Sequence, residues 1–361
     1  MSRPVPLIVG GGPAGAAAAI HLLRSGVQPI VIERRAEPGD ALCGGFISWK
    51  TLEQLEALGL SGRVLGGHEV TTLHLFSGRS VYAVALPGRA MALSRRRLDS
   101  LLLARAREMG AFVRHDTAAY VDGLVRLGNG ELLASDSLFI ATGKHDLHGL
   151  PRPREAAGSD PLLGLRLRLP PSPERAALLA NHIEIHLFPG GYLGAVLQED
   201  GSANFCMAVR KSRLAAAGGQ PAALFAELAQ DSHFLAERLA GMPASPCVDA
   251  VGHIPYGWRA RSSAPGIFRL GDQAGVIASL AGEGIGIALA SAESAVQFWR
   301  RGGGAAAPDF QRAFARKLRR PLAAAGLIAA LGRHPVAATL PLALLSATPG
   351  AAGIIARMTR I

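Results

Sequence analysis

The sequence predicts an α/β fold in which a parallel-sheet domain is interrupted by antiparallel sheet and followed by helices. Three observations predict it. A short apolar run at 5–10 ends in glycines and leads into an alanine- and leucine-rich stretch at 13–25. Residues 163–169 and 182–210 alternate apolar and polar side chains, a pattern typical of antiparallel strands with one exposed face. Residues 311–361 contain two apolar runs of about 12 residues that fit helices.

The elements follow in order along the chain. The first run, the helix ending at Gly26 and a second apolar run ending at Glu33 form a βαβ unit. A hairpin is predicted at 69–86, and a buried strand closes on Gly143. The remaining predicted elements are a helix at 94–110, helical structure at 221–241, a strand at 267–272 and a long helix at 283–299.

Length and composition exclude several classes of protein. The chain has 361 residues, 49% hydrophobic and 18% charged, so two packed regions are expected and wholesale disorder is excluded. No apolar run reaches the length of about 18 residues that a spanning helix needs. The 3 cysteines are scattered and indicate neither a disulfide framework nor a zinc site. The opening residues lack a signal-peptide pattern, so we expect a cytoplasmic protein. We also expect no bound metal.

The net charge of +11 is concentrated late in the sequence. Residues 300–361 hold ten basic side chains and one acidic one, so this segment carries +9 and the other 299 residues only +2. Its two apolar runs fit either a peripheral membrane contact or helices that pack over the sheet domain, and we expect packing. A basic protein that binds membrane or nucleic acid is a remote alternative. We expect no nucleic-acid partner.

A glycine fingerprint, Gly10-x-Gly12-x-x-Gly15, joins the first strand to the first helix. Gly10 allows a tight turn, Gly12 lets the backbone approach a pyrophosphate, and Gly15 lets the helix pack closely on the strand. Glu33 ends the second strand, where an acid can accept a hydrogen bond from a ribose hydroxyl and would repel a 2′-phosphate. FAD or NAD is therefore indicated, and the expected cofactor-binding residues here are Gly10, Gly12, Pro13, Ala14, Gly15, Glu33 and Arg34.

A second motif distinguishes these two cofactors. A strand ends in Gly271-Asp272, and a glycine loop, Gly282 to Gly286, precedes a helix. The pair resembles the second FAD motif of the para-hydroxybenzoate hydroxylase-like superfamily, most closely its geranylgeranyl reductase branch. The resemblance implies that Asp272 bonds the ribityl chain and that the loop lies against the isoalloxazine. The matching cofactor-binding residues are Gly271, Asp272, Gly282, Gly284 and Ile285. A helix N-terminus there would also stabilise negative charge on reduced flavin.

Further positions carry the resemblance, and one departs from it. Arg95, with Leu98 and Asp99, matches an intermediate motif, so Arg95 would reach the cofactor unless it lies on a solvated helix face. Cys43-Gly44-Gly45 resembles a reductase segment beside the flavin, which implies that Cys43 and Gly44 border the cofactor; the alternative is a small buried thiol. Ser279 stands where the family usually has proline.

The predicted substrate and electron-donor sites depart further from the motifs of the superfamily. Tyr192 matches a substrate-binding strand, but Leu193-Gly194-Ala195-Val196 replaces the aromatic residues that follow it in that branch. The hydroxylase branch has an Asp-Gly marker that is absent at 141–149, where Lys144, His145 and His148 could instead meet a transient NAD(P)H donor. His186, His145 and Tyr192 are the candidate general bases, each with a structural role as the alternative. Cys43 and Tyr192 are the expected catalytic residues.

We interpret the chain as an FAD-dependent oxidoreductase. The leading hypothesis is a monooxygenase that hydroxylates a hydrophobic aromatic or polyketide-like substrate, and the rival is a flavin-dependent reductase that saturates C=C bonds of an isoprenoid or quinone. The predicted fold class is α/β: a Rossmann-type FAD-binding domain with an inserted antiparallel β-sheet substrate domain and C-terminal helices. The predicted boundaries are 1–65, 94–150 and 262–315 for the FAD-binding domain, 66–93 and 151–261 for the β-sheet substrate domain, and 316–361 for the C-terminal helical tail.

Overall fold

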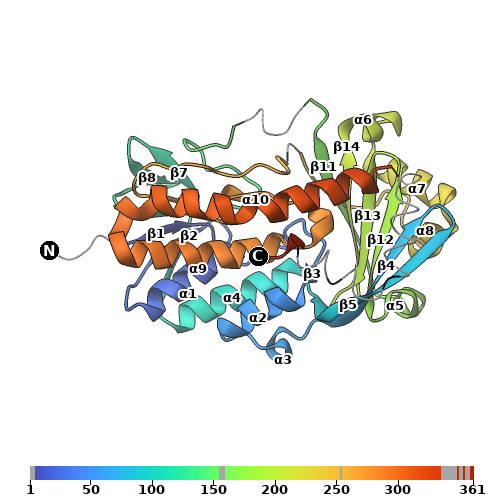
Figure 1. The fold of residues 1–361 in the computed structure, drawn as a ribbon, viewed down its shortest axis with the longest axis horizontal. Helices are drawn as coiled ribbons and strands as arrows, with labels where there is room; N and C mark the ends of the chain where they lie inside the picture. The colour runs from blue at the N-terminus through green and yellow to red at the C-terminus, as the bar shows by residue number, and fades with distance from the viewer. Residues whose placement is uncertain (1–4, 154–158, 253, 335–347, 349–352, 354–357) are drawn as a thin grey trace.

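A five-stranded parallel sheet forms the centre of one half of the molecule, as the computed structural model shows (Figure 1). The strand order is β16-β10-β1-β2-β6, and every neighbouring pair is parallel. The strands are β1 (Leu7–Val9), β2 (Ile30–Glu33), β6 (Phe112–His115), β10 (Leu138–Ile140) and β16 (Ile267–Arg269). The structure describes residues 5–153, 159–252, 254–334, 348, 353 and 358–361.

Both faces of this sheet are covered, which explains its continuously apolar strands. Ile8, Val31, Phe139 and Phe268 belong to a core shared with the helices on one face. A small antiparallel sheet packs on the other face; the sequence analysis did not predict it, because its strands are only 2 to 4 residues long. The helices are α1 (Pro13–Arg24), α4 (Arg95–Glu108), α9 (Gly284–Gly302) and α10 (Ala307–Gly332), and the small sheet consists of β7 (Ala118–Val121), β8 (Leu124–Leu127) and β9 (Leu132–Leu133).

A second sheet of eight strands has the order β15-β11-β14-β13-β12-β4-β5-β3. The predicted hairpin at 69–86 is present as β4 and β5. All pairs are antiparallel except β12 with β4, where the two predicted insertions join in parallel register. The strands are β3 (Phe46–Ile47), β4 (His68–Ser77), β5 (Ser80–Ala92), β11 (Leu162–Leu169), β12 (His182–Phe188), β13 (Gly191–Leu197), β14 (Ala203–Arg210) and β15 (Val248–Val251).

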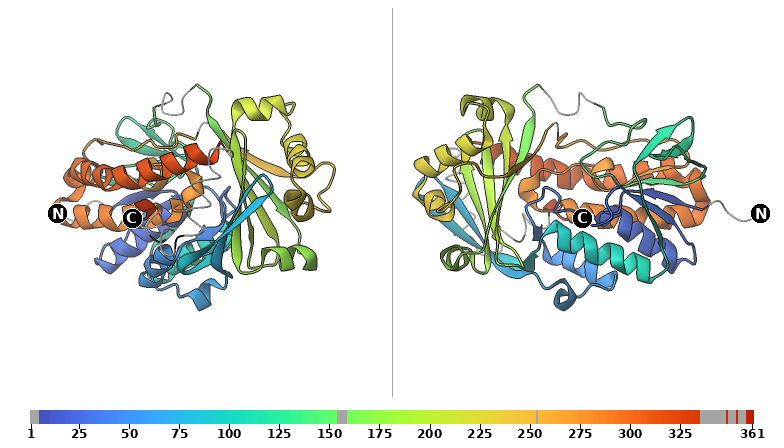
Figure 2. Two further views of the ribbon diagram at one scale, coloured as in Figure 1. Left: turned by 45° about the vertical axis from the view of Figure 1, so that its right-hand side comes forward. Right: turned by 180° about the vertical axis from the view of Figure 1, so that it is seen from behind.

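The expectation that this sheet has one exposed face is wrong. Short helices cover the face turned away from the parallel sheet (Figure 2). Leu193, Phe205 and Met207 are buried there against Leu224 and Phe225, so the strands alternate between two buried faces of different chemistry. The covering helices are α5 (Pro173–Leu179), α6 (Lys211–Ala216), α7 (Pro221–Asp231) and α8 (His233–Arg238).

Serine side chains begin several helices of the molecule. Ser48, Ser61 and Ser94 each accept a hydrogen bond from a backbone N–H in the first turn of the helix that follows. Such caps satisfy an otherwise unpaired donor at the helix start. The helices are α2 (Trp49–Ala57), α3 (Gly62–Leu65) and α4, and they lie near the junction between the two halves.

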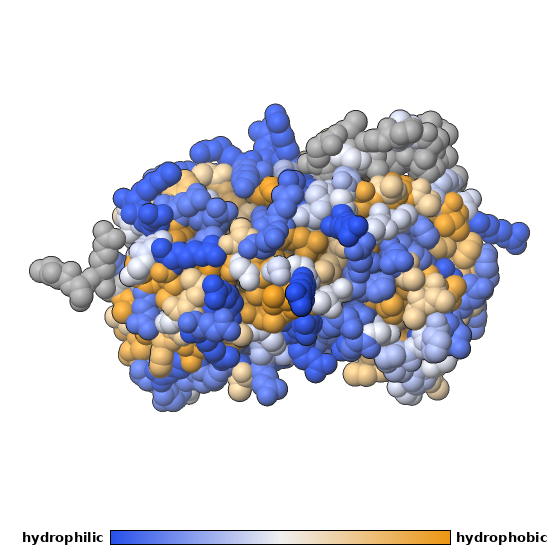
Figure 3. Space-filling view, turned by 90° about the horizontal axis from the view of Figure 1, so that it is seen from below, coloured by the Kyte–Doolittle hydropathy of each residue, from blue (hydrophilic) through white to orange (hydrophobic). Residues whose placement is uncertain are grey.

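Helix α10 crosses position 316, where the predicted tail begins, and continues through Pro321 to Gly332. The apolar run at 335–347 lies outside the described residues. No helix in the described part of the chain is both long enough and apolar enough to cross a membrane. The face seen from below carries separate apolar patches among hydrophilic residues (Figure 3). The predicted combination of a Rossmann-type sheet, a largely antiparallel second sheet and late helices is confirmed.

Candidate flavin site

The first glycine turn brings β1 closer to α1 than side chains would allow. Gly10 has a φ of +105°, and a Cβ there would lie 2.4 Å from the carbonyl oxygen of Ala141. A Cβ on Gly15 would lie 1.8 Å from the carbonyl oxygen of Gly10. Glycine is therefore required at both positions, and the turn presents the start of α1 at the carboxyl edge of the parallel sheet.

The N-terminus of α1 is open to an anion. Gly12 has no side chain to cap the helix, and the first turn contains no acidic residue. Free N–H groups and the helix dipole favour a phosphate at such a position. Beside the turn, Glu33 Oε2 accepts a hydrogen bond from the Gly11 N–H at 2.7 Å, and Arg34 is exposed. These residues fit the diphosphate and ribose of FAD, and their contacts with FAD stay a prediction.

Arg95 is held beside this turn. Its side chain is only 16% exposed and pairs with Asp99 through Nε and Nη2 at 2.8 and 2.7 Å. Nη2 lies 3.4 Å from the point that a Cβ on Gly12 would occupy. Burial lowers the pKa of Arg95, but Asp99 more than compensates and raises it overall, so the guanidinium stays charged. The structure excludes a solvated helix face and supports a contact with the polar part of the cofactor.

The second motif lies against the first. Strand β16 leads into η2 (Gly271–Gln273), and a Cβ on Gly271 would lie 3.3 Å from the Cβ of Ala14 in α1. The backbone carbonyl of Asp272 accepts from Arg152 Nη1 at 3.2 Å, whereas its carboxylate has no partner among the described residues. The carboxylate is therefore available to the hydroxyl groups of a ligand, as the predicted ribityl contact requires.

Two residues that the sequence analysis missed fix the loop at 143–149. Gln273 Nε2 donates to the carbonyls of Gly143 and His145, both at 3.0 Å. Arg152 is 7% exposed and donates to Asp146 Oδ1 at 2.7 Å. Arg152 lies in a proline-rich segment with no periodic or motif pattern that could have marked it. Gln273 directly follows the Gly-Asp pair, and this position could have marked it as part of the site.

Of the three predicted donor-site residues, Lys144 lies closest to the other motifs. Its Nζ donates to the Leu42 carbonyl at 3.0 Å, next to Cys43. His145 and His148 are exposed. Burial, followed by the charges of Arg34 and Lys144, lowers the pKa of His145, so the loop lies in a positively charged environment. A contact with NAD(P)H stays a prediction.

The glycine loop forms a second open helix start. It consists of η3 (Ser279–Ala281) and the residues up to α9. Gly282 has a φ of +63°, and a Cβ there would lie 2.8 Å from the ring of Phe46. Glu283 makes no side-chain cap, and the space around Gly284 is open. Negative charge on a reduced flavin fits this helix end.

The Cys43 segment is anchored by a buried amide. Asn204 on β14 is fully buried and donates to the carbonyls of Cys43 and Gly44, both at 3.1 Å. No atom lies within 4 Å of a Cβ placed on Gly44, and this glycine is exposed. Cys43 itself is partly exposed, which excludes a fully buried thiol. A lone amide in an apolar strand was the signal for Asn204.

A cluster of three hydroxyls links the eight-stranded sheet to the glycine loop. Tyr192 on β13 hydrogen-bonds Ser279, and the Tyr256 hydroxyl lies 3.0 Å from the same serine oxygen. Burial raises the pKa of both tyrosines, so both keep their protons at neutral pH. A proline at position 279 would remove these bonds, which explains the departure from the family pattern. The sequence analysis missed Tyr256 because it lies outside every motif.

The sheet face around Tyr192 is apolar. Gly194 lies on the same side of β13, and a Cβ there would lie 3.4 Å from Cδ1 of Ile185, so aliphatic packing occupies the place where the reductase branch has aromatic residues. The face suits a hydrophobic ligand. Its buried members are Leu75, Val84, Ile185, Leu187, Tyr192 and Ala208, with Leu73, Tyr82 and Leu280 packed against them.

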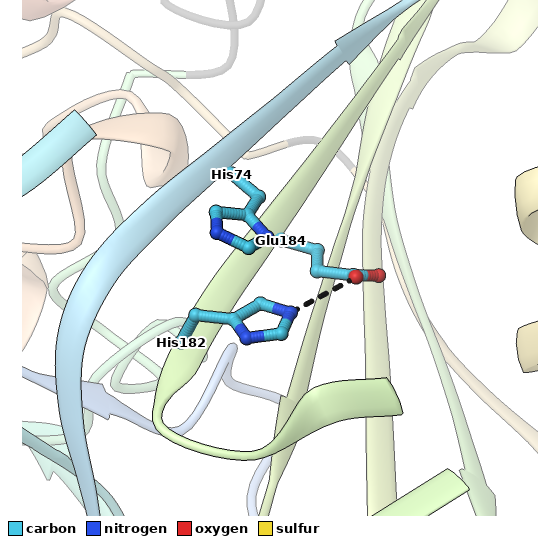
Figure 4. Close-up of side chains that lie close together, drawn as sticks. All are labelled: His74, His182 and Glu184. Carbon is cyan, nitrogen blue, oxygen red and sulfur yellow. Dashed lines mark hydrogen bonds and ion pairs between the residues drawn. The ribbon is translucent and has the colours of Figure 1, made fainter. Parts of the chain in front are cut away.

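The opposite face of the same strands carries a buried charge cluster (Figure 4). Glu184 is fully buried, and its oxygens accept four hydrogen bonds, from His182 at 3.1 Å, His186 at 3.0 Å and Arg238 twice at 2.9 Å. Burial raises the pKa of Glu184, but these donors lower it overall to well below its usual range. His186 therefore belongs to this cluster and cannot act as a base at the flavin site.

His74 joins Glu184 and His182 in a group whose ligand atoms lie within 4.8 Å of one another. The bidentate guanidinium of Arg238 already compensates the carboxylate, and its positive charge disfavours a cation at the same oxygens. The rings of His74 and His182 stack with their centroids 4.0 Å apart. We therefore describe the group as an ion-pair network.

Comparison with known proteins identifies the cofactor class. Residues 4–126 match the family model described as an FAD binding domain. The chain is 25% identical over 331 residues to a menaquinone reductase of Mycolicibacterium smegmatis, covering 84% of this chain and 78% of that protein. It is 28% identical over 308 residues to digeranylgeranylglycerophospholipid reductase 1 of Methanopyrus kandleri, covering 78% and 76%.

Solved structures share the fold. Pseudomonas aeruginosa PqsL in complex with 2-aminobenzoylacetate has a TM-score of 0.73 at 18% identity, over 96% of this chain and 100% of PqsL. The flavin-dependent halogenase CmlS has a TM-score of 0.71 at 22% identity over 90% of this chain, which spans only 63% of CmlS. The predicted superfamily, FAD as cofactor and the class of FAD-dependent oxidoreductase are confirmed.

Proposed function

We propose that this FAD-dependent oxidoreductase of the para-hydroxybenzoate hydroxylase-like superfamily saturates C=C bonds in a lipophilic isoprenoid chain, such as that of a quinone or a lipid. The observation that carries the proposal is the hydroxyl cluster of Tyr192, Ser279 and Tyr256 between the apolar sheet face and the glycine loop. Reducing a C=C bond requires a hydride and a proton, and bound FAD supplies the hydride chemistry.

The chain's own residues would supply the other parts of the reaction. The apolar face holds an isoprenoid chain and excludes water from it. As the π bond breaks, one carbon gains the hydride and the neighbouring carbon takes a proton from the hydroxyl of Tyr192 or Tyr256. Ser279 is exposed and bonded to both tyrosines, so it can return a proton from solvent. Arg95 and Asp272 would hold the polar part of the cofactor.

The curated relatives favour this reaction. One carries the name of a menaquinone reductase and another that of a digeranylgeranylglycerophospholipid reductase, so both names denote reduction. Cys43-Gly44-Gly45 resembles the reductase branch, and Asn204 holds this segment at the edge of the sheet face. We regard Cys43 as a lining residue of the site and Tyr192 as the first candidate for the proton donor.

A monooxygenase acting on an aromatic or polyketide-like substrate is the second candidate. The observation that favours it is the loss of the aromatic wall: Leu193-Gly194-Ala195-Val196 stands where the reductase branch has aromatic residues. The two candidates differ in their need for oxygen. A reductase transfers hydrogen under anaerobic conditions, whereas a monooxygenase consumes oxygen when substrate is added.

The test is anaerobic mixing of photoreduced, FAD-loaded protein with menaquinone in detergent micelles. Reoxidation of the flavin together with a product that stays heavier by two hydrogens after air has returned any quinol to the quinone would support the reductase. A hydroxylated product formed only with oxygen would overturn it. In the variants Tyr192→Phe and Tyr256→Phe we expect the proton-coupled step to slow by roughly 10²-fold in at least one, while FAD affinity stays unchanged. Arg63→Gln, at an exposed site on α3, is the matched control.

The electron donor is part of the proposal. We propose that a nicotinamide docks transiently at the 143–149 loop, where Lys144 and Arg152 are positively charged and His145 and His148 are exposed. Anaerobic mixing with NADH and with NADPH, followed by flavin bleaching, tests this. Bleaching by neither would remove the nicotinamide from the proposal.

We further propose that the domain division predicted from the sequence holds except at 316, which lies inside α10. We also propose that α10 faces a membrane from which the substrate enters. Arg316, Arg319 and Arg320 are exposed on this helix, ahead of Leu327, which is 64% exposed. Co-sedimentation with anionic and neutral liposomes at low salt would compare the protein with a variant carrying Glu at the three arginine positions. Equal binding would remove the membrane contact. Charge reversal leaves α10 in place, which matters because Phe310 and Phe314 of this helix belong to the core.

A further inference from the structure

A buried glutamate lies inside the glycine loop that faces the flavin site. Glu283 is 1% exposed and stands between Gly282 and Gly284. Its carboxylate folds against the first turn of α9, where Oε1 would lie 2.4 Å from a Cβ on Gly286. The side chain therefore occupies the space beneath the loop, and Gly286 is the residue that makes this possible.

The positive charge that compensates Glu283 comes from far along the sequence. Arg360 Nη1 donates to Glu283 Oε2 and to the Ala281 carbonyl, both at 2.7 Å. The guanidinium carbon lies 5.0 Å from the centre of the Trp49 ring, and the side chain is only 11% exposed. Residues 358–361 thus return to the middle of the molecule, where the chain end is marked in Figure 1 and Figure 2.

Other partners do not fully satisfy the carboxylate. Ser48 Oγ donates to Oε2 at 3.3 Å, and the backbone N–H of Ile361 also donates to the carboxylate. Oε1 is buried and has no partner among the residues that the structure describes. Burial raises the pKa of Glu283, and Arg360 opposes the rise. Within the described residues, Arg360 is the charged side chain that faces this carboxylate from residues 358–361, and the hydroxyls of Ser48 and Thr51 face it from the start of α2.

We propose that Arg360 is a positioning residue for the cofactor: by neutralising Glu283, it keeps the Ser279–Gly286 loop in the shape that receives the flavin. An uncompensated carboxylate at this place would seek water and draw the loop out of position. It would also put negative charge beside the isoalloxazine and disfavour its reduction. The inference requires FAD binding only and does not depend on the reductase reaction.

The experiment measures FAD dissociation constants by flavin fluorescence between about pH 5.5 and pH 8.5, with circular dichroism as a check of folding. For Arg360→Gln we expect affinity about tenfold or more weaker at the high end, recovering toward low pH as Glu283 gains its proton. For the double variant Glu283→Gln/Arg360→Gln we expect affinity within roughly threefold of the original at every pH. Arg63→Gln, with an exposed arginine elsewhere, is the matched control.

A second readout separates positioning from general destabilisation. The midpoint potential of the bound flavin should fall in Arg360→Gln and return in the double variant, whereas a loss of stability alone would leave it unchanged. Arg360→Gln with unaltered affinity and potential, or a double variant as weak as the single one, would overturn the proposal. If Arg360→Gln does not fold, Arg360→Lys takes its place. Unaltered FAD affinity and flavin potential in Arg360→Lys would support the role of the positive charge. A tenfold loss of FAD affinity in this variant would overturn the proposal.

Discussion

Glu184 and Glu283 are both buried glutamates, but their surroundings differ. Glu184, in the eight-stranded sheet, accepts four hydrogen bonds, and its pKa lies well below the usual range. Glu283, under the glycine loop, has one guanidinium partner and one orphaned oxygen, and its pKa is raised. A fully satisfied buried charge fixes the structure, whereas a partly satisfied one is easily perturbed. The first cluster therefore serves stability, and the second lies where function requires adjustment.

The largest effect is expected from breaking the satisfied cluster. Arg238→Gln would leave Glu184 buried without a positive partner, so we expect a loss of about 3–5 kcal/mol in the free energy of unfolding. Urea denaturation of the FAD-loaded protein measures it. Affinity for FAD in the folded protein should stay within about twofold, because the cluster lies on the sheet face away from the cofactor. A loss below about 1 kcal/mol would contradict the comparison.

Acid should act on the same cluster. The folded-state pKa of Glu184 is depressed, so its contribution to stability is present above the unfolded pKa of about 4.3 and is lost as the pH falls. Burial also lowers the pKa of His186, so stability begins to fall as the pH drops below about 6.5. We expect a slope of up to about 1.4 kcal/mol per pH unit for each group. In denaturation series at stepped pH, the free energy of unfolding of Glu184→Gln should no longer fall in the low-pH range where Glu184 gains its proton.

The smallest effect on unfolding is expected at the second glutamate. Glu283→Gln removes a charge that is only partly compensated and keeps the hydrogen-bonding shape, so we expect a change within about 1 kcal/mol. The matched substitution Glu184→Gln should cost several times more in the same urea series, because it leaves Arg238 without its bidentate partner. Equal losses in the free energy of unfolding at Glu184 and Glu283 would show that the number of hydrogen bonds to each carboxylate does not explain how the two sites differ.

Much of the cofactor site could be predicted because it depends on local rules. The backbone needs glycine at Gly10 and Gly15 whatever surrounds them, since their positions follow from a turn between a strand and a helix. The second FAD motif and Arg95 were expected from their resemblance to motifs of the para-hydroxybenzoate hydroxylase-like superfamily, each within a single segment. The comparisons bear out the cofactor, and the individual FAD contacts stay predictions.

The residues that the sequence did not predict are those that act across long separations. Arg152 reaches Asp272, Tyr256 reaches Ser279, and Arg360 reaches Glu283. None of them carries a periodic or motif signal, and each pairing depends on how distant segments pack. The covered outer face of the eight-stranded sheet was missed for the same reason. Alternation shows that a strand has two different faces, but not that helices pack against the second.

The sequence by itself determined the first glycine motif and the order of the helices and strands around it, because steric and capping rules operate over a few residues. The choice of FAD over NAD came from the resemblance of the second motif to the para-hydroxybenzoate hydroxylase-like superfamily. Only the tertiary structure decided which charges are satisfied and which apolar side chains surround Tyr192. It also decided that an arginine late in the chain lies beneath the cofactor loop. These outcomes depend on burial and on partners far apart in sequence, which local patterns do not encode.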